Sequence, residues 1–159
     1  MDKRSKIAVL GFGVEGKAVL EWLVKHQYGS VTVCDQNVDL EVELPDGVSC
    51  RLGPDYLADL TDFEVIFRSP GISILRPEIV AAAVAGAEIT SATNYFMDQC
   101  PGKVIGVSGT KGKGTTCTLI YELLKKSGLE AGRNLFLGGN IGKCAMDFFD
   151  DVQGDGVVV

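Results

Sequence analysis

The chain has 159 residues, of which 46% are hydrophobic and 23% are charged, and its formal net charge is -6. This composition is typical of a folded globular protein and excludes a disordered or collagen-like chain. The acidic excess argues against non-specific binding to nucleic acid, and no apolar run approaches the roughly 18 residues that span a bilayer. Because no signal-peptide pattern follows Met1, we expect a cytoplasmic protein that binds neither nucleic acid nor membrane.

The cysteines and the distribution of charge bear on chemistry and on domain organisation. No C-x-x-C motif or cysteine-histidine cluster is present, so we interpret all the cysteines as reduced core thiols. Residues 1–100 contain 8 basic and 15 acidic side chains, whereas residues 101–159 contain 7 and 6. This change predicts a boundary within 91–102, which divides the chain into domains at 1–92 and 93–159. The cysteines are Cys34, Cys50, Cys100, Cys117 and Cys144.

Apolar runs of strand length alternate with helical patterns in the first hundred residues. We predict strands at 7–10, 31–34 and 63–67 and helices at 16–27 and 77–85. Pro77 suits the first turn of the second helix, because its missing N–H would have no partner there. Near-continuous apolar strands separated by helices are typical of an α/β fold, in which helices cover both faces of a parallel sheet.

The pattern repeats in the remainder of the chain. It predicts a short helix around 95–97, strands at 103–107 and 156–159, and a helix at 114–127 that Gly128 ends. Two neighbouring aromatic residues, Phe148 and Phe149, lie near the C-terminus, and we expect them to be exposed.

A glycine-rich turn follows the first predicted strand. Residues 11–16 read Gly-Phe-Gly-Val-Glu-Gly, a G-x-G-x-x-G motif between a strand and a helix, and Asp35 ends the next strand. Gly11 and Gly13 would let the turn tighten around a diphosphate, and Gly16 would let the helix pack closely on the strand. Asp35 would accept hydrogen bonds from a ribose or a base. The motif predicts a Rossmann-type nucleotide site and is compatible with NAD, FAD and nucleotide sugars alike.

A second glycine-rich loop lies between the strand predicted at 103–107 and the helix predicted at 114–127. Successive backbone amides of such a loop bind phosphate oxygens, and Lys113 would reach the terminal phosphates. Gly114 stands where the usual phosphate loop has a serine or threonine, so a hydroxyl for Mg²⁺ would come from Thr115 or Thr116. The loop predicts an ATP site formed by Gly109, Thr110, Lys111, Gly112, Lys113, Gly114, Thr115 and Thr116.

With these two loops in this order, the sequence resembles the Mur ligase family. Folylpolyglutamate synthetases share the ATP loop, but only the Mur ligases have a Rossmann-like unit before it. The branch that adds D-glutamate is the most similar, and the implied fold is a Rossmann-like parallel-sheet domain followed by the start of a P-loop-type ATPase α/β domain. Three further segments match in order: Ser69-Pro70-Gly71-Ile72, Gly86-Ala87-Glu88-Ile89 and Gly138-Gly139-Asn140-Ile141-Gly142.

The resemblance implies an ATP-dependent amide ligase of peptidoglycan precursor synthesis, which joins D-glutamate to UDP-MurNAc-L-alanine through an acyl phosphate. The parent enzyme would be monomeric, with a UDP-substrate domain at 1–92 and the first part of the central ATP-binding domain at 93–159. Lys113 and Asn140 match catalytic positions, and Thr115 matches a hydroxyl beside Mg²⁺. The matching UDP-substrate residues are Gly11, Gly13, Val14, Glu15, Gly16, Asp35, Gln36, Asn37, Ser69, Pro70, Gly71 and Asn140.

The sequence also departs from the family pattern. Glu15 stands where the family has a small or hydroxyl residue, and Lys111 stands where it has an asparagine. The family also has a basic residue near the position of Asn37, which this sequence lacks. The family continues beyond the strand at 156–159 to a metal-binding glutamate and a third domain, so we expect a truncated fragment without turnover.

Another branch of the Mur ligases remains open as an alternative. Two functions of other classes also remain open. An NAD-dependent oxidoreductase would use the first glycine loop and leave the second without a role. A non-catalytic nucleotide-binding module would retain both loops and the binding of a UDP compound.

Overall fold

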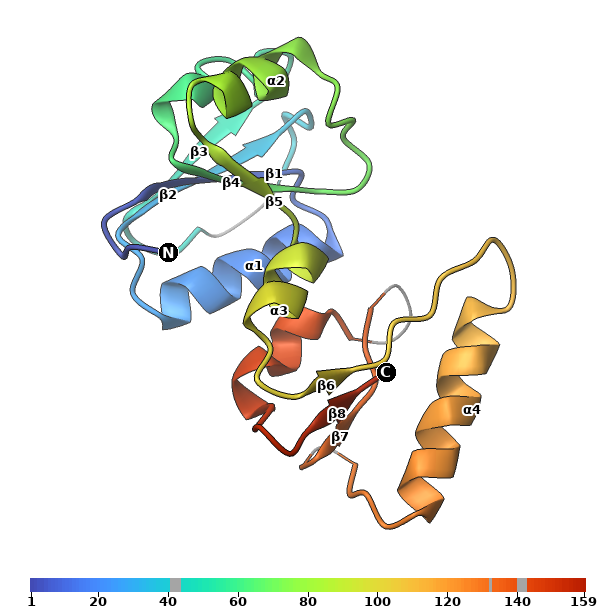
Figure 1. The fold of residues 1–159 in the computed structure, drawn as a ribbon. Helices are drawn as coiled ribbons and strands as arrows, with labels where there is room; N and C mark the ends of the chain where they lie inside the picture. Colours follow the sequence, from blue (N-terminus) through green and yellow to red (C-terminus); the bar gives the residue numbers. More distant parts are fainter. Residues whose placement is uncertain (41–43, 132, 140–142) are drawn as a thin grey trace. The chain divides into compact units, whose positions relative to one another are not determined.

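The computed structural model describes residues 1–40, 44–131, 133–139 and 143–159. The chain divides into two compact units, Met1–Ala92 and Thr93–Val159, whose elements are labelled in Figure 1. Each unit has its own parallel sheet and at least one helix beside it. The predicted α/β class is therefore confirmed.

The first unit is built on a sheet of five parallel strands in the order β3-β2-β1-β4-β5. The central strand β1 places Ile7 beside Val31 of β2 and Val65 of β4. It is covered on both faces, which explains why its sequence is an unbroken apolar run. The strands are β1 (Lys6–Leu10), β2 (Ser30–Asp35), β3 (Val48–Leu52), β4 (Val65–Arg68) and β5 (Glu88–Thr90).

Helices cover the two faces of this sheet, as Figure 1 shows: α1 (Val14–Lys25) lies on one face and α2 (Pro77–Val84) on the other. Alternate residues of β1 pack on opposite sides. Ala8 and Leu10 belong to a buried cluster with Ile79 of α2 and Leu60 of the 3₁₀ helix η1 (Leu60–Asp62). The intervening Val9 faces α1, where a Cβ placed on Gly16 would lie 3.5 Å from it.

Both helices begin and end close to their predicted bounds. The helix α1 starts at Val14, two residues earlier than predicted, because Gly13 serves as its N-cap. Pro77 is the first residue of α2, and Gly86 follows the C-cap Ala85 with φ +103°. Two strands of this sheet, β3 and β5, are absent from the predicted set, because both lie at the sheet edges and carry polar side chains, and β5 has only 3 residues.

The second unit contains three short parallel strands in the order β6-β8-β7. The first of them, β6, is shorter than the predicted strand at 103–107, because β8 pairs with Lys103 and Val104 and then accepts only one further bond, from Ile105 N–H to Val158 O. The elements are α3 (Ala92–Gln99), β6 (Lys103–Val104), α4 (Lys113–Lys126), β7 (Leu135–Phe136), the 3₁₀ segment η2 (Ala145–Asp151) and β8 (Val157–Val158).

An aromatic cluster forms the core of the second unit. Phe96 meets Phe148 and Phe149 edge-on, with ring centroids 5.8 and 5.5 Å apart, and Phe148 stacks on Phe136 at 5.3 Å. The expectation that Phe148 is exposed is wrong, because its side chain is 7% exposed, and Phe149 is half-buried. Such ring pairs are favoured beyond the area they bury.

The cysteines are reduced, although they are not all core residues. None of the five forms a disulfide among the described residues, and only Cys34 and Cys144 are buried, while Cys50 is exposed. Burial raises the pKa of the Cys34 thiol to about 11, which keeps it protonated and unreactive. The prediction of five core thiols is therefore wrong for Cys50, and Cys100 and Cys117 are only partly buried.

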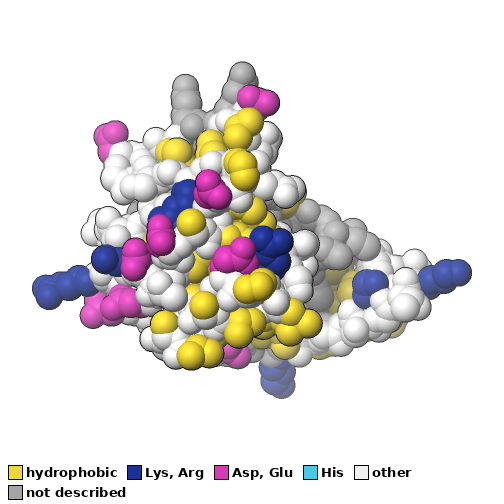
Figure 2. Space-filling view, turned by 90° about the horizontal axis from the view of Figure 1, so that it is seen from above, with side chains coloured by type: hydrophobic (Ala, Val, Ile, Leu, Met, Phe, Trp, Pro, Cys, Tyr) yellow, Lys and Arg dark blue, Asp and Glu magenta, His cyan; other side chains and the backbone are white. Residues whose placement is uncertain are grey.

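The surface mixes apolar and charged side chains. In Figure 2, seen from above, hydrophobic side chains lie among both basic and acidic ones. The helix α2 and the loop before it contribute exposed Ile74, Leu75, Val80 and Val84, while Ile79 and Ala82 turn inward. Within the described part of the chain, no helix has the length and hydrophobicity needed to cross a membrane.

The inward side of α2 should govern the stability of the first unit. Ile79 is fully buried, so Ile79→Ala should lower the free energy of unfolding by about 2–5 kcal/mol. Val84, on the same helix, is 84% exposed, and Val84→Ala should change it by less than about 0.5 kcal/mol. Urea unfolding followed by the fluorescence of Trp22, the single tryptophan, reports on this unit. Equal shifts of the midpoint in both variants would contradict this packing.

Close packing at Gly16 gives a second prediction. A Cβ at Gly16 would lie 2.2 Å from Gly11 O, so Gly16→Ala must push α1 away from the turn and should cost at least about 2 kcal/mol. A Cβ at Gly13 meets nothing within 4 Å, and Gly13→Ala should cost about 1 kcal/mol or less. The same Trp22 fluorescence measurement compares the two variants. If Gly13→Ala proved the more damaging, the described contact between α1 and the turn would be wrong.

Candidate functional site

A cavity of about 520 Å³ lies at the carboxyl edge of the sheet in the first unit. Strands β1, β2 and β4 end there, beside the point at which the strand order reverses between β1 and β4. Ligands of open parallel sheets bind at this type of position. The lining residues are Gly11, Phe12, Gly13, Asp35, Gln36, Tyr56, Ser69, Gly71, Ile72, Ser73 and Arg76.

The turn after β1 requires a glycine at position 11. Gly11 has φ +84°, and its N–H donates to Cys34 O at 2.8 Å. A Cβ there would lie 2.8 Å from the Cβ of Ser69, whose own N–H donates to Leu10 O at 2.9 Å. The absence of a side chain thus lets the loops after β1 and β4 meet at the cavity.

Asp35 connects the loops after β1 and β2. Its Oδ2 accepts a hydrogen bond from Phe12 N–H at 2.6 Å, and its Oδ1 accepts one from Asn37 N–H at 2.8 Å. The carboxylate therefore holds both loops in place while each oxygen keeps lone-pair capacity for a ligand. Its predicted role as a ligand acceptor is compatible with this arrangement, and its structural role is additional.

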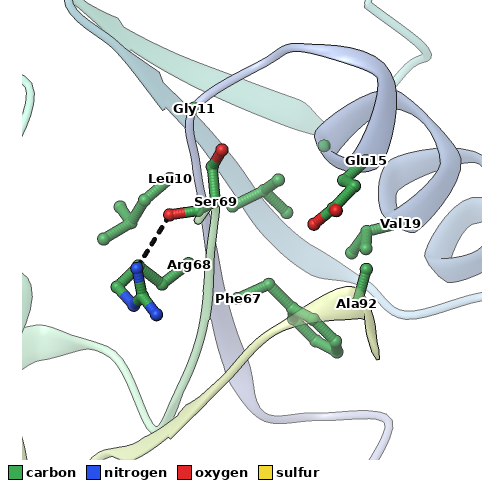
Figure 3. A pocket seen from close by; sticks show the side chains of 10 residues that line it. Leu10, Gly11, Glu15, Val19, Phe67, Arg68, Ser69 and Ala92 are labelled. Carbon is green, nitrogen blue, oxygen red and sulfur yellow. Dashed lines mark hydrogen bonds between the residues drawn. The ribbon is translucent and has the colours of Figure 1, made fainter. Parts of the chain in front are cut away.

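Arg68 shapes the loop after β4. Its guanidinium donates to Ser69 O at 3.0 Å, the dashed line in Figure 3, and also to Ile72 O. The N–H of Ile72 donates in turn to Ser69 O at 3.0 Å, which closes the turn through Pro70 and Gly71. These bonds fix the backbone that forms one wall of the cavity.

A second, much smaller cavity of about 10 Å³ is shown in Figure 3, where Glu15 and Val19 of α1 face Phe67 of β4. This is space for about one water molecule. Glu15 Oε2 is buried and has no hydrogen-bond partner among the described residues. Burial raises the pKa of the Glu15 carboxyl, and the positive charge of Arg68 offsets part of that rise.

The structure brings most of the predicted UDP-substrate positions to these two cavities. Glu15 and Gly16 line the smaller one, whereas Val14, which is 75% exposed, Asn37 and Pro70 line neither. The predicted residues in the larger cavity are Gly11, Gly13, Asp35, Gln36, Ser69 and Gly71.

The larger cavity also contains residues that the sequence analysis missed. Tyr56 follows β3, and Ser73 and Arg76 belong to the loop between β4 and α2. The signal that points to Arg76 is its position directly before Pro77, since the loop that enters this helix must pass the carboxyl edge of the sheet. No comparable signal marks Tyr56, because β3 itself was not predicted.

The second glycine loop leads into α4 in the second unit. Gly112 has φ +76° and is the N-cap of α4, with no side-chain hydrogen bond to the first turn. The first N–H groups of the helix are therefore available to a ligand. Lys113 Nζ donates to Gly109 O, so its ammonium group lies back over the loop.

The predicted ATP residues are contiguous around the start of this helix. Thr115 and Thr116 lie in its first turn and are exposed, as are Thr110 and Lys111 in the loop. Asn140, predicted to be catalytic, lies outside the described residues. In the described ranges, no three His, Cys, Asp or Glu side chains come together in a group that could hold a metal ion.

Comparisons with known proteins show which family the two glycine loops and the parallel sheets belong to. Residues 5–91 match the model of the Mur ligase MurD-like N-terminal domain. The UDP-N-acetylmuramoylalanine–D-glutamate ligase of Clostridium botulinum is 40% identical over 99% of this chain, and that of Ruminiclostridium cellulolyticum is 39% identical over 94%. The chain covers 34% and 32% of the length of these two relatives.

A solved structure, a pseudomurein peptide ligase type C from Methanothermus fervidus, aligns with 98% of this chain and 32% of its own, with a TM-score of 0.47 and 21% identity. The family is shown by the match of residues 5–91, which is more than half of the chain. The chain belongs to the Mur ligase family, and its first unit is a MurD-like N-terminal domain.

Proposed function

We propose that this chain is the substrate-binding and first ATP-binding portion of a ligase that adds D-glutamate to UDP-MurNAc-L-alanine in cytoplasmic peptidoglycan synthesis. The observation that carries the proposal is the 520 Å³ cavity at the carboxyl edge of the sheet, which lies inside the region that matches the MurD-like domain. The relatives' names supply the reaction, and their identity of about 40% supports it. The parent ligase acts as a monomer.

The first unit would bind the UDP part of the substrate. Gly11, Gly13 and Gly16 allow backbone amides and the start of α1 to approach a diphosphate closely. Asp35 at the end of β2 and Gln36 after it line the same cavity, and Ser69 and Gly71 line it from the loop after β4. We assign Val14, Asn37 and Pro70 to the rim of this site on the family match alone.

The second unit would bind ATP through the loop 109–116. Its donors suit a polyphosphate, because the first turn of α4 lacks a side-chain cap, two lysines flank Gly112, and the hydroxyls of Thr115 and Thr116 are exposed. When bound, ATP with Mg²⁺ supplies the phosphoryl group that activates the substrate carboxylate. Lys113 would neutralise phosphate charge, and Thr115 would lie beside the metal. Asn140 would contact the substrate near its reacting end.

Titration calorimetry of the chain with UDP-MurNAc-L-Ala, UDP and NADH tests the substrate site. Both UDP compounds should bind saturably with one site per chain, because the larger cavity lies wholly within the first unit. NADH should show no heat of binding. Binding of NADH without binding of either UDP compound would overturn the ligase assignment and favour an oxidoreductase.

The carboxylate of Glu15 predicts a pH dependence of substrate binding. Because the pKa of Glu15 is raised, lowering the pH from 8 to 5 protonates this carboxylate before an exposed glutamate, and its repulsion of the diphosphate weakens. UDP-MurNAc-L-Ala, whose diphosphate diester keeps its charge over this range, should therefore bind about two- to fivefold more tightly at the lower pH.

A matched pair of variants isolates this effect. Glu15→Gln should bind the substrate more tightly than the wild type at pH 8 and lose the pH dependence. Glu21→Gln removes an exposed charge from the same helix and should behave as the wild type. A pH profile unchanged in Glu15→Gln would show that Glu15 does not face the bound diphosphate.

A further inference from the structure

The larger cavity has an uneven distribution of charge. Among its described lining residues, Asp35 is the acid and Arg76 is the single cation. Lys17 of α1 places its ammonium group 6.0 Å from the centroid of the Phe12 ring, and it does not line the cavity. Arg76 is therefore the counter-charge that the described lining residues offer to an anionic group in the cavity.

Asp35 makes that counter-charge necessary. Both of its oxygens accept backbone hydrogen bonds, from Phe12 and Asn37, so its negative charge is fixed at the edge of the cavity. An anionic ligand is repelled by this charge, and the neighbouring Gln36 supplies only a neutral amide. The backbone amides of the glycine turn carry only partial charges, so the full positive charge in this lining is that of Arg76, in the loop between β4 and α2.

The backbone of Arg76 is held firmly in that loop. Its N–H donates to Ser73 O at 3.2 Å, and its carbonyl oxygen accepts from Ile79 and Val80 at 3.0 Å each. Pro77 follows it and restricts its backbone to an extended conformation, with φ -59° and ψ 132°. The fully buried side chain of Ile79 ties this point to the core of the first unit.

The guanidinium of Arg76 still has donors to offer. One nitrogen, Nη2, donates to Glu78 Oε1 at 3.2 Å, and the two side chains are 48% and 38% exposed. The other N–H groups make no hydrogen bond within the described residues, and a guanidinium carries five donors in a planar fork. Glu78 can thus steer the arginine while the remaining edge binds an oxyanion in a bidentate manner.

We propose that Arg76 is the residue that selects phosphate in this cavity, and that it pairs with the diphosphate of a uridine nucleotide. This inference rests on the proposed function of the first unit as a UDP-substrate domain. It assigns recognition of charge to the loop between β4 and α2, in addition to the glycine turn after β1.

Calorimetric titration with UDP and with uridine at pH 7.5 separates phosphate recognition from recognition of the base. Arg76→Gln should weaken the binding of UDP by roughly tenfold or more and leave that of uridine unchanged, because only UDP carries the anion. Arg76→Lys, which keeps the charge but not the fork, should give an intermediate affinity. In the wild type, added NaCl should weaken UDP more than uridine.

Arg133 offers a matched control. It pairs with Glu130 at 3.0 Å in the second unit, so Arg133→Gln removes the same charge from a similar ion pair and should leave UDP binding unchanged. Equal UDP affinity in Arg76→Gln and the wild type would overturn the role of Arg76 while the UDP site itself stands. Equal losses for UDP and uridine would also overturn it, as a structural effect. No UDP binding by the wild type would overturn the proposed function as well.

Discussion

The architecture of the first unit depends on the close approach of Gly16 to the turn after β1. A side chain at Gly16 would fall within 2.2 Å of Gly11 O, so α1 can start where it does only because that position is bare. The turn is fixed independently by bonds from Gly11 N–H to Cys34 O and from Phe12 N–H to the Asp35 carboxylate. The position of α1 and the mouth of the cavity are therefore set by backbone contacts and by the Asp35 carboxylate.

The cavity walls are held before any ligand arrives. Arg68 and Ile72 close the loop after β4 around Ser69, and Asp35 ties together the loops after β1 and β2. A site organised in this way spends little binding free energy on ordering its own backbone. The remaining conformational freedom of the site lies in its exposed side chains, and the charged residue among these is Arg76.

Much of this fold and part of the site could be predicted from the sequence. The strands β1, β2 and β4 are apolar because helices cover both faces of the sheet, and the glycine pattern marked the turn after β1. The edge strand β3 has no such pattern, since its residues are partly exposed, and Tyr56 after it was missed for that reason. Phe148 was misjudged because its burial depends on Phe96, about fifty residues earlier, a contact that local sequence patterns do not encode.

The two glycine loops of the chain, both proposed to bind phosphate, differ in their physical surroundings. In the first unit, Gly16 packs closely against the turn, Glu15 lies beside it, and Arg76, the cation among the described lining residues of the larger cavity, comes from another loop. In the second unit, the loop itself carries Lys111 and Lys113, and its residues are largely exposed around the uncapped start of α4. The first loop contributes shape and the second contributes charge. Under the proposed function, a shaped turn would hold the diphosphate of a sugar nucleotide, whereas a positively charged, exposed loop would suit the phosphates of ATP.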